Sequence, residues 1–137
     1  MSGPPEPGDE AFRWLGQATE DLDTARHIQG NPELPARMPC FPAHLAAEKS
    51  LKALLIRARM PFPKSHDLVR LYELLPSDRG PELELADLEL LNPWAVDGCC
   101  TAHTADASHA LATELVSKAG RILLAVQEYL EAVTAAD

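Results

Sequence analysis

Residues 40–75 read CFPAHLAAEKSLKALLIRARMPFPKSHDLVRLYELL, and the organisation of the whole chain follows from this segment. At 100° per residue, the apolar side chains of residues 43–59 fall on one side of a helix, and the basic side chains point nearly the opposite way. The apolar side consists of Ala47, Leu51, Leu54 and Ala58, and the basic side of Lys49, Lys52 and Arg59. We therefore expect a helix that packs through one face and presents cations on the other.

A flank between these two faces mixes apolar and ionisable side chains: His44, Glu48, Lys52, Leu55 and Arg59. Glu48 and Lys52 are four residues apart, which is the spacing of an ion pair on a helix. We expect His44 to be an exposed histidine of the first turn. Any ligand chemistry is expected along this flank or close to it.

The twelve prolines divide the chain into helical windows, because proline lacks an amide donor and clashes with the preceding helical turn. Residues 9–29 repeat small or apolar side chains every three or four positions. A third helix of about ten residues begins near Ser65 and Asp67, a fourth covers residues 82–91, and the longest covers residues 105–135. The sequence predicts an all-α, up-and-down antiparallel bundle of four to five helices.

The expected domain organisation is simple. One domain covers residues 9–135 and follows a disordered tail at residues 1–8, which is rich in proline. The N-terminal sequence MSGPPEPGDE has no apolar run, so we expect neither a signal peptide nor a membrane anchor.

The formal net charge of −9 argues against a protein that coats nucleic acid through its charge alone. Residues 49–70 nevertheless carry six basic and one acidic side chain, a local charge of +5. This window is either the solvated face of a helix or a local site for an anion such as phosphate. The candidate ligand-binding residues are Lys49, Lys52, Arg59, Lys64 and His66.

The cysteines do not indicate a disulfide scaffold. Cys99 and Cys100 are neighbours, whose bridging would be strained, so we expect a reducing, cytoplasmic location. Together with His103 and His109 they form a metal-like cluster, but adjacent cysteines rarely reach one ion. We therefore expect no metal and no cofactor.

Two segments resemble a known family. AAEKSLKALLI (46–56), followed after a short linker by FPKSHDLVRLYELL (62–75), resembles the HEPN domain, named for higher eukaryotes and prokaryotes nucleotide binding. The pattern of Trp14–Ala25 is similar to the first helix of that domain, and the resemblance covers most of residues 11–130. It implies a helical bundle that usually forms a homodimer and is often encoded beside a minimal nucleotidyltransferase in a toxin–antitoxin pair.

The resemblance also raises the question of catalysis, because many members are metal-independent ribonucleases that use an arginine, four to six residues, and then a histidine. That spacing occurs as Arg37…His44 and Arg59…His66. Where minimal members carry the motif, this chain reads LNPWAVDGCC (91–100), without an arginine. Metal-free RNA cleavage needs a base and a cation together, so the catalytic candidates are Arg59, His44 and His66. The alternative for His66 is a structural residue that starts the third helix and bonds across the turn.

Three functions remain open from the sequence. The first is a non-catalytic binding module that takes a nucleotide or another anion on the basic flank and pairs with a minimal nucleotidyltransferase. The second is a metal-independent endoribonuclease that acts on RNA. The third is a structural dimerisation module.

Overall fold

The computed structural model describes residues 7–95 and 107–137. Within these ranges the chain forms five α-helices, a short 3-10 helix and no strand, which confirms the prediction of an all-α bundle. The elements are α1 (Pro7–Gln29), α2 (Cys40–Arg57), α3 (Leu68–Glu73), α4 (Leu85–Leu91), η1 (Asn92–Trp94) and α6 (His109–Ala136). The expected tail falls mostly outside the described residues, and its last two residues, 7 and 8, already belong to α1.

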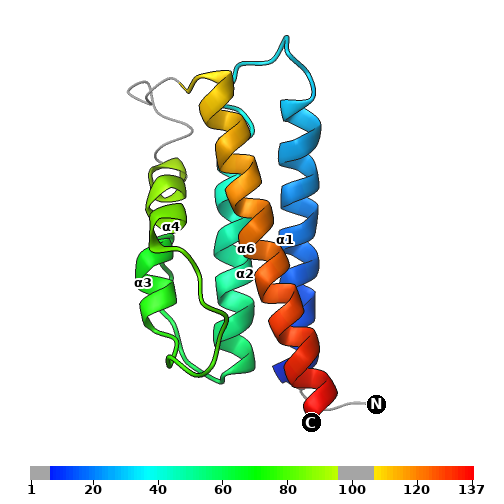
Figure 1. Ribbon diagram of the computed structural model, residues 1–137, viewed down its shortest axis with the longest axis vertical. Helices are drawn as coiled ribbons and strands as arrows, with labels where there is room; N and C mark the ends of the chain where they lie inside the picture. The colour runs from blue at the N-terminus through cyan, green and yellow to red at the C-terminus, as the bar shows by residue number, and fades with distance from the viewer. Residues whose placement is uncertain (1–6, 96–106) are drawn as a thin grey trace.

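Three long helices, α1, α2 and α6, form the frame of the bundle (Figure 1). α1 and α2 run in opposite directions, and α6 returns so that it ends where α1 begins. The short helices α3 and α4 pack against α2 and α6 on the side away from α1. α2 is therefore the central helix, with neighbours on most of its sides.

Both α1 and α2 bury small side chains. Fully buried alanines occur on both helices, and small buried side chains allow neighbouring helices to approach closely. These alanines are Ala11, Ala18 and Ala25 on α1, and Ala43, Ala46 and Ala47 on α2. Leu15 and Leu22 complete the predicted repeat on α1 and are also buried, so the predicted core face of this helix is confirmed.

The prediction that α2 packs through a single face was wrong. Twelve residues of this 18-residue helix are buried, and they lie on nearly every side of it. Lys52, expected among solvated cations, is only 8% exposed. The central position of α2 is the physical reason, because side chains opposite the first apolar face meet other parts of the chain instead of water.

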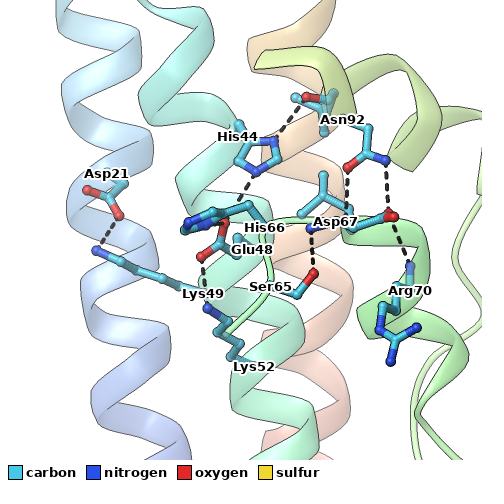
Figure 2. Close-up of polar contacts among 12 residues, drawn as sticks. Asp21, His44, Glu48, Lys49, Lys52, Ser65, His66, Asp67, Arg70 and Asn92 are labelled. Atoms are coloured by element: carbon cyan, nitrogen blue, oxygen red, sulfur yellow. Dashed lines mark hydrogen bonds and ion pairs between the residues drawn. The ribbon is translucent and has the colours of Figure 1, made fainter. Parts of the chain in front are cut away.

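α2 ends in a Schellman motif that places Arg59 in the left-handed region, with φ 58°. The Met60 amide donates to the Leu55 carbonyl at 2.9 Å, and the Arg59 amide donates to the Ile56 carbonyl at 3.0 Å. Glycine is the usual residue at such a position because it has no Cβ to clash. The linker that follows contains Pro61 and Pro63 and runs back along α2 (Figure 2).

α3 and α4 are shorter than predicted. Asp67 caps α3 by accepting from the amides of Val69 and Arg70, as the sequence predicts, but the helix has six residues. α4 begins at Leu85 because the Tyr72 hydroxyl bonds the carbonyl of Pro81 and the amide of Leu83, which holds residues 81–83 outside the helix.

None of the helices in the described ranges 7–95 and 107–137 combines the length and the apolar character that crossing a membrane requires.

Candidate functional site

A buried carboxylate, that of Glu48 on α2, lies at the centre of a polar cluster (Figure 2). Glu48 is only 4% exposed. Its Oε2 accepts from Lys52 Nζ at 2.9 Å, and its Oε1 lies 2.8 Å from His66 Nδ1 and 3.3 Å from His44 Nε2. The predicted pair of Glu48 and Lys52 is therefore confirmed, but it is buried and belongs to a larger cluster.

The expectation that His44 is exposed was wrong, because its side chain is fully buried. Its Nδ1 lies 3.0 Å from the carbonyl oxygen of Leu91, at the end of α4, and its Nε2 faces Glu48. Both neighbours are acceptors, and a neutral imidazole carries only one N–H group. Both contacts are hydrogen bonds only when the ring carries two N–H groups. Through these two contacts His44 joins α2 to α4.

Lys52 is held on two sides. Besides its bond to Glu48, its ammonium lies 5.9 Å from the ring centroid of Trp14 and 5.8 Å from that of Phe62. The two rings meet edge to face, with centroids 6.5 Å apart. A cation over aromatic faces gains electrostatic stabilisation. Lys52 thus fastens the linker, through Phe62, to α1 and α2.

His66 is the part of the cluster that reaches solvent. Its side chain is 57% exposed, although its Nδ1 contacts the buried Glu48 carboxylate. Because an ionised carboxylate only accepts, Nδ1 must donate. No hydrogen bond of Nε2 occurs within the described part of the chain, so this nitrogen is open to a ligand. When neutral it offers a lone pair, and when protonated it offers an N–H donor.

The pKa of Glu48 reflects two opposing effects. Burial raises it, but hydrogen bonds from His44, Lys52 and His66, together with the charge of Lys52, outweigh burial and lower the pKa from 4.5 to about 2. Glu48 therefore stays ionised over the neutral range, and the donors around it stay oriented.

A second polar contact fixes the start of α3 beside the site. The Asn92 amide donates to Asp67 Oδ1 at 2.9 Å, and Asn92 Oδ1 accepts from the Leu68 amide at 2.9 Å (Figure 2). The side-chain bond from Asn92, followed by the capping amide of Arg70, lowers the pKa of Asp67. The segment that carries His66 is therefore anchored on both sides.

The remaining predicted ligand-binding residues lie apart from one another. Lys49 forms an ion pair of 2.8 Å with Asp21 of α1, so its charge is already paired within the protein. Lys64 is exposed on the linker, two residues before His66. Arg59 lies beyond the end of α2, which ends about 14 Å along the helix axis from Glu48. Arg59 and His66 are thus not brought together as a catalytic pair.

Sequence reasoning missed the aromatic rings of Trp14 and Phe62 as members of this site, as well as Asn92. Their positions depend on how the linker returns along α2, and local spacing carries no signal for that. An aromatic residue between two prolines, as at Phe62, was the one available hint.

The described residues contain no group of three or more His, Cys, Asp or Glu side chains arranged to hold a metal ion. Of the metal-like cluster, Cys99, Cys100 and His103 lie outside the described residues, and His109 is exposed at the start of α6. Burial raises the pKa of the Cys40 thiol to about 11, so it remains a packed, unreactive side chain.

Comparison with known proteins identifies relatives. The family model of the HEPN domain matches residues 11–129. TT1696 from Thermus thermophilus has a similar crystal structure, with a TM-score of 0.72 and 26% identity over 87% of this chain and 97% of that one. ST0689, an archaeal HEPN homologue, has the same fold, with a TM-score of 0.66 and 22% identity over 88% of this chain and 97% of that one. No curated protein matches the chain.

Proposed function

Because the chain belongs to the HEPN domain family, we propose that it is a binding module that takes a nucleotide, or another phosphate-bearing ligand, at the edge of α2 marked by His66. In this proposal the module forms a homodimer and pairs with a minimal nucleotidyltransferase, as in toxin–antitoxin systems. The assembly and the partner rest on the family resemblance, and the ligand site rests on the geometry of the cluster.

The observation that carries the ligand site is the orientation of His66. A ring that is half exposed would ordinarily sample several rotamers, and ordering it on binding would cost free energy. Here the 2.8 Å contact between His66 Nδ1 and buried Glu48 fixes the ring before a ligand arrives. When the ring is protonated, its outward Nε2–H group is therefore preorganised to donate to a phosphate oxygen.

The charge around His66 favours an anion. Lys52 and His44 both face Glu48, so the negative charge of this carboxylate is already paired inside the protein. Lys64, on the same linker, is exposed and has no ion pair within the described residues. An anion near His66 can therefore pair with the exposed Lys64 and, when the ring is protonated, with His66 itself.

Titration with ATP and with a short single-stranded RNA tests the proposal. We expect saturable NMR shifts centred on His66 and Lys64, with a smaller shift at Lys52, which feels the ligand through Glu48. His66→Ala should weaken binding about tenfold or more, because one charge-assisted hydrogen bond is lost.

His27→Ala is the matched control, because His27 is also an exposed histidine but lies in the last turn of α1. It should leave the affinity unchanged. Absence of any shift at His66 and Lys64, with either ligand and after addition of a partner nucleotidyltransferase, would reject the site.

One observation favours the ribonuclease as a second candidate. A histidine whose Nδ1 is held by a carboxylate presents Nε2 as a general base, which is the orientation that such catalysis needs. The same RNA titration separates the two functions. A ribonuclease would cleave the RNA in EDTA and lose this activity in His66→Ala, whereas RNA that stays intact while it binds disposes of this alternative.

A purely structural module predicts neither binding nor cleavage.

Leu85 on α4 and Leu124 on α6 are about half exposed, and such side chains suit the proposed homodimer. A monomer by light scattering at micromolar concentration would contradict the dimer.

A further inference from the structure

Three arginines line two cavities whose other walls include residues from the start of α1 and the end of α6. Figure 1 shows these two helix ends at the same end of the bundle. Arg57 is the last residue of α2, Arg59 follows it, and Arg79 comes from the connection between α3 and α4. They line two cavities of about 300 and 260 Å³, which share Arg57 and Asp137. None of the three belongs to the His66 cluster.

A carboxylate already lies among these arginines. Asp137 Oδ2 is 2.7 Å from Arg57 Nη2, although the Asp137 side chain is 69% exposed. An exposed ion pair of this kind is weak, because water competes for both charges. The pair nevertheless indicates which kind of ligand the cavity can hold, namely one with a negatively charged oxygen that faces a guanidinium group. Asp137 can be displaced by a ligand with more oxygens or more charge.

Arg59 completes the Schellman motif at the end of α2 and also lies at the smaller cavity. Its φ of 58° costs free energy for any residue with a Cβ, and glycine would avoid that cost. An arginine is present instead, and it lines the smaller of the two cavities.

We propose that this arginine pocket binds a small phosphate-bearing ligand, and that Asp137 is an internal competitor for it. Phosphate suits the pocket better than a carboxylate does, because it offers more acceptor oxygens to guanidinium groups from separate segments. Because phosphate carries more negative charge than a carboxylate, it can compete with Asp137 and Asp9 for the arginines. Asp9 lines the smaller cavity. Tyr129 and Val133 provide an apolar wall for the rest of the ligand, and the cavity volume limits that part to a few atoms.

Titration of the whole protein with inorganic pyrophosphate, followed through the side-chain N–H signals of its arginines, tests this site. We expect saturable shifts at Arg57 and Arg79. Asp137→Asn should tighten binding by about two- to fivefold, since it removes the competitor. Arg57→Gln should weaken binding about tenfold. Succinate, a dicarboxylate of similar size, should bind more weakly than pyrophosphate.

The Arg59→Gly variant distinguishes a role of Arg59 in ligand binding from a purely structural role. Relief of the left-handed strain should raise the folding equilibrium constant roughly fivefold, while pyrophosphate affinity falls. A structural role alone would raise stability and leave the affinity unchanged, which would overturn the assignment of Arg59. His66→Ala should not alter pyrophosphate binding at the arginines. The arginine site and the proposed His66 site are therefore tested independently.

Three results would overturn the pocket proposal. They are the absence of saturable shifts at Arg57 and Arg79, an Asp137→Asn variant that binds no better than the parent protein, and succinate binding as tight as that of pyrophosphate.

Discussion

Replacement of Glu48 by glutamine is expected to lower the free energy of unfolding by about 3–5 kcal/mol, because it removes the single counter-charge of a buried cluster. Glutamine has nearly the same shape, so the packing is preserved. Its amide, however, replaces one of the two acceptor oxygens with an NH2 group, which faces either Lys52 or the two histidines. At least one buried donor is left unsatisfied, and Lys52 is left as a buried charge without a partner.

Urea denaturation of the parent and Glu48→Gln proteins measures this loss. Asp21→Asn is the matched control, since it removes a carboxylate from another ion pair between α1 and α2 whose side chains are less buried. The control should cost about 1 kcal/mol or less. A Glu48→Gln variant that loses no more than the control would mean that the cluster does not act as a unit.

Acid should destabilise the protein through the same carboxylate. The pKa of Glu48 is about 2 in the folded protein against 4.5 for an unperturbed glutamate, so the unfolded chain binds its proton first as the pH falls. The stability that Glu48 contributes is fully present above about pH 4.5 and is lost progressively toward pH 2. The lowered pKa of Glu48 corresponds to about 3 kcal/mol of folding stability.

Unfolding free energies measured between pH 6 and pH 2 in parent and Glu48→Gln proteins check this dependence. The parent should show the steeper decline below about pH 4.5, so the gap between the two proteins narrows as the pH falls. Parallel curves would indicate that Glu48 has an ordinary pKa in the folded protein.

The helices of the frame could be predicted because their periodicity is local. The three- and four-residue steps on α1 set its buried face, and similar steps on α6 bury Leu115, Ala119, Ile122 and Val126. α2 was misread for a physical reason. An amphipathic pattern assumes water on one side, whereas α2 is surrounded, so Lys49 and Lys52 find carboxylates inside the bundle.

The candidate site was predictable only in part. His44, Glu48 and Lys52 were placed together on one flank by helical spacing, and they do contact one another. The contribution of His66 depends on the extended linker turning back along α2, which follows from tertiary packing and not from residue spacing. Because the linker returns along α2, His66 lies beside Glu48, whereas Arg59 stays beyond the end of α2. The sequence spacing had paired Arg59 with His66.

The tautomer of His66 provides the sharpest test that buried Glu48 organises the solvent-facing histidine. Ring nitrogen chemical shifts, measured by NMR where His66 is neutral, report which nitrogen carries the proton. We expect the proton on Nδ1 in the parent protein and a shift toward Nε2 in Glu48→Gln. A parent protein whose His66 carries its proton on Nε2 would contradict the account.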